Sequence, residues 1–289
     1  MRKDTRLTIR LLLPLSLLLG LFSLSACVKD LDLERIDLGQ VLNTAQQAFG
    51  EVDVQQETLI GKEAVSVLLG AVPLLENDPL QRYVNQVGHW VALHTERSDL
   101  AWKFAVLDSP DINAFAAPGG YILITKGLLL KLQSEAELAG VLAHETVHVV
   151  RKHHLAAVQQ GARLDLAVQL GRAGVDEKHE ETMEKLSRGF KELYARGLDK
   201  NDEFEADRMG VVIAARAGYD PYGLPAVLQT LAGMSPDDTS LAFLFSTHPA
   251  PARRLSLLER LYDRLDPYAR QPQLQQRFEQ QIASLRSRS

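Results

Sequence analysis

The chain has 289 residues, of which 46% are hydrophobic and 24% charged, and its formal net charge is -5. This balance is typical of a globular protein with enough apolar mass for one sizeable core. The basic residues are scattered and only 6% of the residues are aromatic, so no nucleic-acid partner is expected. A single cysteine excludes a disulfide within the chain.

The N-terminus has the pattern of an export signal. Four basic residues among the first ten precede an apolar run over residues 11–22, which indicates a secretory signal peptide and is short for a membrane span. Leu24-Ser25-Ala26-Cys27 then resembles the bacterial lipobox. We therefore predict a signal peptide over residues 1–26 and a lipid on Cys27 that anchors the chain. The alternative is a plain signal cut after Ala26. Val28, in place of an aspartate, favours the outer membrane over the inner one, on the periplasmic side.

Helical spacing dominates the rest of the chain, with strand patterns only near residue 110. The predicted elements, in chain order, are two helices within 62–94 separated by a turn at residues 73–79, strands over 102–106, 113–116 and 121–125, and helices over 134–154, 155–172, 177–198, 203–217, 224–231 and 249–265. Ser134 followed by Glu137 is a capping-box signature, which makes 134–154 the best-defined helix.

These elements predict a mostly helical α+β fold with a small sheet. The predicted organisation is a tether over 27–60, one domain over 61–270 and a polar helical tail over 271–289.

The clearest chemistry lies in His144-Glu145-Thr146-Val147-His148, inside the best-defined helix. Two histidines four residues apart share one helical face, so both imidazoles can reach one ion. Glu145 lies about 100° round the helix, near enough to contact a water on that ion without binding the ion itself. Neutral nitrogen donors suit zinc, and a catalytic zinc takes three protein ligands and a water. The pattern predicts one Zn²⁺ per chain, with Glu145 as general base.

The third zinc ligand is expected from an acidic segment about sixty residues later. Glu203 and Asp207 are four residues apart and share a helical face, whereas Glu205 points elsewhere. We predict Glu203 as the ligand and Asp207 as the acceptor that holds the non-metal nitrogen of a ligand histidine. The competing assignment makes Glu205 the ligand.

Together with these motifs, further stretches of the chain resemble the M48 metallopeptidase family. The matching stretches are Asn113 to Tyr121, Ser134 to Ala139 leading into the histidine motif, Glu203 to Asp207, and Ser246 to Pro249. They occur in family order and span roughly residues 60 to 260. The resemblance implies a zincin-like domain of the gluzincin type, in which the first Glu of the acidic segment, here Glu203, binds zinc. Val147 departs from the family pattern, which has Gly or another small residue there.

The relatives that span membranes carry several apolar helices, which this sequence lacks after its signal. The resemblance is therefore to the soluble, lipid-anchored envelope branch of the family.

A zinc site of this kind predicts peptide hydrolysis. Glu145 accepts the proton of a zinc-activated water and passes it to the leaving amine. The strand Asn113-Ala114-Phe115-Ala116 is predicted to border the cleft and to pair with the substrate backbone; alternatively, it is an internal strand without a substrate role. His248 either donates a hydrogen bond to the oxyanion, occupies the fourth zinc position at rest, or caps a helix start before Pro249.

Four other polar residues have weaker patterns. Arg254 either pairs with an acid near the zinc helices or lies on the surface. His153 and His154 are predicted at a solvated helix end, and Tyr219 is interpreted as a packing residue rather than an oxyanion donor.

The sequence thus favours a zinc endopeptidase that cleaves extended or misfolded envelope proteins. Its expected partners are unfolded polypeptides, the membrane through the lipid anchor, and an envelope assembly machinery. The alternative is an envelope chaperone or assembly factor with little proteolytic turnover, against which the presence of Glu145 argues. A metal-storage lipoprotein would need several sites, whereas the sequence supports one.

Overall fold

The computed structural model describes residues 50–161, 198–235 and 238–287. Its elements are α3 (Val54–Ala71), α4 (Asp78–Ala92), β1 (Lys103–Leu107), β2 (Ala114–Ala117), β3 (Tyr121–Thr125), α5 (Lys126–Lys131), α6 (Glu135–Val150), α9 (Lys200–Arg216), α10 (Gly223–Ala232), α11 (Ala242–Thr247), α12 (Pro251–Leu258), α13 (Tyr262–Leu265) and α14 (Gln275–Arg286). Residues 153–161 are helical as well. The predicted signal peptide, Cys27 and the parts of the predicted helices 155–172 and 177–198 that fall within residues 162–197 lie outside the described residues.

The fold is mostly helical with one three-stranded sheet, as predicted from the sequence. The strand order is β1-β3-β2, with β1 parallel and β2 antiparallel to β3. All three predicted strands are present, and the third has the predicted bounds. The first covers 103–107 instead of 102–106 and the second 114–117 instead of 113–116, so Asn113 directly precedes β2. Val106, Ile122 and Ile124 of the sheet are fully buried and belong to the main hydrophobic core. β1 and β2 are the two outer strands, on either side of β3.

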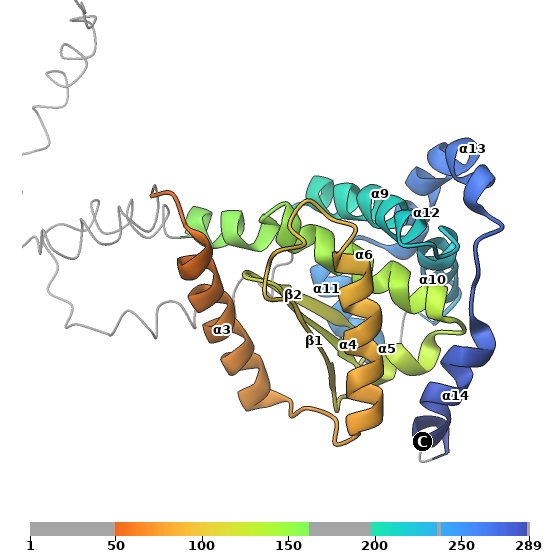
Figure 1. The fold of residues 1–289 in the computed structure, drawn as a ribbon, viewed down its shortest axis with the longest axis horizontal. Coiled ribbons are helices and arrows are strands. Elements are labelled where there is room, and N and C mark those ends of the chain that lie inside the picture. Colours follow the sequence, from red (N-terminus) through yellow and green to blue (C-terminus); the bar gives the residue numbers. More distant parts are fainter. Residues whose placement is uncertain (1–49, 162–197, 236–237, 288–289) are drawn as a thin grey trace, which may run out of the picture.

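Helix α6 runs through the middle of the molecule (Figure 1). Every residue from Glu135 to Val149 is buried, as expected for a helix that is covered on all sides. Strands β2 and β3 and helix α4 pack against it, and so do α9 and α10. Ser134 caps the helix by accepting the Glu137 amide at 3.1 Å. The predicted capping box is only half formed, because the Glu137 carboxylate accepts the amide of Gln133 rather than that of Ser134.

Several helix boundaries differ from the predictions. Helix α3 begins at Val54, inside the stretch expected as a spacer, because Asp53 and Gln56 form a full capping box. Helix α6 ends at Val150 rather than at residue 154. The helix predicted over 249–265 is divided into α12, a 3₁₀ turn and α13. Helices α5 and α11 are short and were not predicted.

The C-terminal helix α14 packs onto the main core. It was predicted as a polar tail, yet Phe278, Ile282 and Leu285 on one face are buried and the helix contacts α4, α5 and α6. Arg277 of this helix also pairs with Glu135 at the start of α6. Among the described residues, no helix is both long enough and apolar enough to cross a membrane.

Candidate metal centre

Two helices, α6 and α9, bring the predicted ligands together. Helix α6 carries His144 and His148, and α9 carries Glu203 and Asp207 on the side that packs against α6. Gly210 lies one turn beyond Asp207, and a side chain there would reach 3.1 Å from the backbone nitrogen of His144. The close approach of the two helix backbones at this glycine places the α9 carboxylates within reach of the α6 imidazoles.

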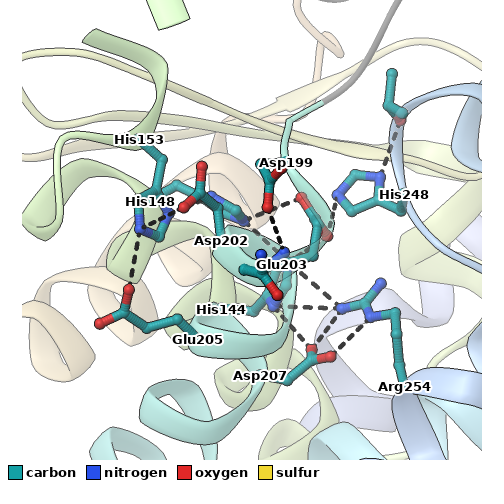
Figure 2. A network of polar contacts seen from close by, with 12 residues as sticks. His144, His148, His153, Asp199, Asp202, Glu203, Glu205, Asp207, His248 and Arg254 are labelled. Atoms are coloured by element: carbon teal, nitrogen blue, oxygen red, sulfur yellow. Dashed lines mark hydrogen bonds and ion pairs between the residues drawn. The ribbon is translucent and has the colours of Figure 1, made fainter. Parts of the chain in front are cut away.

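His144, His148 and Glu203 present one donor atom each to a common point (Figure 2). The two Nε2 atoms are 3.2 Å apart. The Glu203 oxygens lie 3.7 Å from Nε2 of His144 and 3.5 Å from Nε2 of His148. Donors that bind zinc tetrahedrally at about 2.1 Å are about 3.4 Å from one another. The two nitrogens are separated by nearly this distance, and each is approached by a different oxygen of Glu203, Oε2 at His144 and Oε1 at His148. The three side chains are therefore close enough together to share one ion.

The surroundings of Glu203 also fit a cation. Its Oε2 atom is buried and has no hydrogen-bond partner among the described residues, which is costly for a carboxylate oxygen. Burial raises the pKa of Glu203 well above its ordinary value; Arg254 opposes this effect, and Glu145 and Asp207 add to it. A divalent ion at this point would offset the burial and the repulsion together.

The other nitrogen of His144 is held by a carboxylate. Asp207 Oδ1 lies 3.0 Å from His144 Nδ1, which leaves Nε2 free of its proton and available to a metal. Arg254 donates two hydrogen bonds to Asp207, at 2.9 and 2.6 Å, and is buried. Burial raises the pKa of Asp207, but the Arg254 guanidinium and the bond to His144 outweigh it and hold that pKa well below its usual range. The interpretation of Arg254 as a partner of an acid near the zinc helices is confirmed.

Glu145 faces a cavity beside the three donor atoms. The same cavity is lined by residues 113–116, by His148 and Glu203, and by His248. Burial raises the pKa of Glu145 to about 8, so this carboxyl can exchange a proton near neutral pH, as general acid–base catalysis requires.

His248 follows helix α11 and points toward the centre (Figure 2). Its Nε2 atom lies 3.7 Å from Glu203 Oε2, and its Nδ1 atom is 2.9 Å from the Thr247 hydroxyl oxygen. Burial and the neighbouring Arg254 lower the pKa of His248 well below its ordinary value, so the ring is neutral. His144, Glu145 and His248 also present donor atoms within 4.8 Å of one another.

Asn113 is the polar residue of the predicted substrate strand. Its side chain is 1% exposed, and neither its Nδ2 nor its Oδ1 atom has a hydrogen-bond partner among the described residues. The amide lines the cavity together with Ala114, Phe115, Ala116 and Glu145. A buried amide that lacks partners is destabilising by about 1–3 kcal/mol per group. An unpartnered amide that lines a cavity is expected where a bound ligand supplies the missing hydrogen bonds.

Three weaker predictions have clear outcomes. The prediction that His153 and His154 are solvated is wrong, because they are only 6% and 8% exposed. Tyr219 donates to Glu135 at the opposite end of α6, which confirms a packing role. Glu205 is not in the three-donor group; it contacts Arg151 and His153 instead.

The sequence reasoning missed the contact between His153 and His148. The two Nδ1 atoms are 3.0 Å apart. The spacing of five residues places these side chains apart on a continuous helix, so the pattern gave no signal for the contact.

Comparisons with known proteins agree with this geometry. A model of peptidase family M48 matches residues 78–262. The beta-barrel assembly-enhancing protease of Yersinia pestis is 30% identical over 230 residues, which are 76% of this chain and 47% of that protein. The protein of the same name in Escherichia coli (strain K12) is 28% identical over 215 residues, 72% of this chain and 44% of that protein. The mitochondrial metalloendopeptidase OMA1 of Schizosaccharomyces pombe is 28% identical over 218 residues, 74% of this chain and 63% of that protein. The chain spans less than two thirds of the length of each of these relatives.

Proposed function

The chain belongs to peptidase family M48, and from this premise we propose that it is a zinc-dependent endopeptidase acting on extended or misfolded envelope proteins. One observation carries the proposal. His144, His148 and Glu203 each offer one donor atom, all within 4.8 Å of one another, and Glu145 lines the cavity beside them. A metal site of purely structural use would close its fourth position with a protein ligand and would not need a carboxylate beside it.

In this proposal His144, His148 and Glu203 hold one zinc ion. When bound, zinc supplies acidity to a water molecule and polarises the scissile carbonyl. Glu145 takes the proton of the attacking water and delivers it to the leaving amine nitrogen. Its pKa of about 8 before zinc binds falls as a cation approaches, which favours the ionised base at neutral pH.

His248 acts as a hydrogen-bond donor toward the carbonyl oxygen of the substrate. The ring is neutral and therefore carries one proton. The single proton of the Thr247 hydroxyl can go to the Leu244 carbonyl oxygen at 3.3 Å or to His248 Nδ1 at the shorter distance of 2.9 Å. We take the shorter contact as the hydrogen bond, which places the ring proton on Nε2, the atom that faces the centre. A donor placed where negative charge develops in the transition state accelerates acyl transfer.

The substrate lies as an extended chain beside residues 113–116. β2 is one of the two outer strands in the order β1-β3-β2, and residues 113–116 line the cavity that contains Glu145. Strand addition of this kind reads the backbone more than the side chains, and a peptide group offers both the donor and the acceptor that the Asn113 amide lacks. Both features favour unfolded polypeptides of varied sequence.

The cellular setting of the proposal rests on the N-terminal pattern and on the relatives. A lipid on Cys27 would attach the enzyme to the outer membrane on its periplasmic side. Two of the relatives are named for enhancing beta-barrel assembly, so we include an envelope assembly machinery among the partners, with quality control of misfolded proteins as the role.

The deciding experiment compares the wild type with Glu145→Gln. Both proteins should contain one zinc per chain, and only the wild type should cleave an unfolded substrate such as casein. Chelation should abolish cleavage, and added zinc should restore it. If Glu145→Gln retains the full biological activity of the wild type in cells, the chain works as a chaperone or assembly factor and the endopeptidase proposal fails.

A further inference from the structure

The two ligand histidines of α6 are supported in different ways. His144 contacts a carboxylate directly, because Asp207 lies 3.0 Å from its Nδ1 atom. The Nδ1 atom of His148 contacts another imidazole instead, that of His153, at 3.0 Å. The remaining nitrogen of His153 then lies 3.4 Å from Glu205 and 3.7 Å from Asp202, both on α9. Figure 2 shows this row of side chains on the far side of the centre from Arg254.

A turn in the backbone makes the contact between the two rings possible. Helix α6 ends at Val150, and Lys152 has a φ of 59°, a left-handed conformation that a lysine adopts at a steric cost. This turn interrupts the helix, and the His153 ring packs at 5.1 Å from the His148 ring. The side chain of His153 is only 7% exposed, so water does not readily replace either partner.

The positions of the ring protons determine which group donates and which accepts each hydrogen bond in this row. To bind a metal through Nε2, neutral His148 must carry its proton on Nδ1. That proton must be donated, so Nδ1 of His153 must be the acceptor. The proton of His153 is then on Nε2, which faces the Glu205 carboxylate. Glu205 is held in place by Arg151, which contacts its other oxygen at 2.9 Å.

We propose that His153 is a positioning residue that fixes the metal-binding tautomer of His148, with Glu205 and then Asp202 as the carboxylate end of the row. The inference rests on the proposed zinc site, since it concerns how one ligand of that site is prepared. Partners of this kind keep the ligand nitrogen free and the ring in place, and their loss weakens metal binding about 10- to 100-fold.

Two substitutions at residue 153 separate hydrogen bonding from packing. His153→Asn retains an acceptor oxygen near the position of Nδ1 but loses volume, whereas His153→Phe retains a ring but has no acceptor. If His153 works as an acceptor, His153→Phe should bind zinc about 10- to 100-fold more weakly, and His153→Asn should stay within a few-fold of the wild type. Packing alone predicts the reverse order.

The experiment measures two quantities on the full-length chain. Zinc affinity is obtained by competition with a chromophoric chelator. The tautomer of His148 is read from ring nitrogen NMR shifts of the zinc-free protein, where the wild type and His153→Asn should carry the proton on Nδ1 and His153→Phe should populate the Nε2 form. Far-ultraviolet circular dichroism checks that each variant is folded.

The outcomes distinguish this inference from the function on which it rests. If His153→Phe is folded, binds zinc like the wild type and keeps the Nδ1 tautomer, the inference is overturned. If the wild type binds no zinc, the proposed function fails, whereas the tautomer measurement still decides whether His153 orients His148.

Discussion

Asp207→Asn is a sensitive test of how the site is organised. In the native protein the carboxylate accepts from His144 Nδ1 at 3.0 Å and from Arg254 at 2.9 and 2.6 Å. An asparagine of the same size retains one acceptor oxygen but turns an N–H donor toward one of the two donor groups. Oδ1 accepts from both His144 and Arg254, whereas Oδ2 accepts from Arg254 alone. If the amide nitrogen takes the place of Oδ1, His144 loses its acceptor. In either orientation Arg254 loses one hydrogen bond and its charged partner inside the protein.

The magnitude follows from which contact is lost. If His144 loses its acceptor, its Nε2–H tautomer becomes populated and zinc affinity falls about 10- to 100-fold, or about 1.4–2.8 kcal/mol. If Arg254 loses its partner, a buried guanidinium is left unpaired and the zinc-free protein is destabilised by about 3–5 kcal/mol. We expect both effects, since three donor nitrogens compete for one remaining oxygen.

Two measurements separate the effects. Denaturant unfolding of the zinc-free protein reports the loss at Arg254, and chelator competition reports the loss at His144. Asp263→Asn serves as the matched control, because Asp263 is exposed on α13 and the same substitution there should change neither quantity. If Asp207→Asn changes neither zinc affinity nor the stability of the zinc-free protein, the carboxylate orients neither His144 nor Arg254 and the reasoning is refuted.

Three other substitutions test the surroundings of the site. Glu57 is fully buried and accepts two hydrogen bonds from Arg97. Burial raises the pKa of Glu57, but the contacts with Arg97 outweigh burial and the net pKa is lowered. Glu57→Gln should therefore destabilise the protein by up to about 3 kcal/mol at pH 7, as measured by urea unfolding at several pH values. A lowered pKa stabilises the fold in full above the unfolded pKa of about 4.3, and this stabilisation is lost as the pH falls through the folded pKa. The difference in unfolding free energy between the wild type and Glu57→Gln should therefore shrink below pH 4. A difference that stays constant with pH would contradict this account of Glu57. A Cβ at Gly61 would lie 1.7 Å from the Pro118 carbonyl oxygen, so Gly61→Ala should cost about 1–3 kcal/mol despite the higher helix propensity of alanine; a gain in stability would show that α3 does not pack there. Asn113→Ala should raise KM for an unfolded substrate about 10-fold with zinc content unchanged, and an unaltered KM would remove Asn113 from the substrate site.

The parts that could be predicted from the sequence are those fixed by local pattern. The histidine motif, the acidic segment and the three strands each have a period or a spacing that decides their geometry without knowledge of distant residues. Glu203 was favoured over Glu205 because only Glu203 shares a face with Asp207, and the structure places only Glu203 beside the histidines.

The parts that were missed depend on a break between helices or on distant partners. Lys152 carries no signal of a left-handed turn, since glycine or asparagine is the usual residue there. For this reason His153 and His154 were expected in solvent. Helix α11 is six residues long, too short for a period to be recognised. The buried face of α14 was not recognised because the sequence there is rich in glutamine. Only three apolar residues mark that face, Phe278, Ile282 and Leu285.

The approach of α9 to α6 explains why this site needs so few residues. Glu203, Asp207 and Gly210 succeed one another at intervals of four and three residues, so they form one stripe of the helix. Because Gly210 has no side chain, the backbone of His144 can approach it closely. The same contact sets how far the side chains of Glu203 and Asp207 reach toward the histidines of α6. Glu205 lies outside this stripe and meets Arg151 and His153 beyond the end of α6. A single helix thus supplies a candidate ligand, the direct support of one histidine and the carboxylate behind the other. Its position along α6 therefore controls all three contacts together.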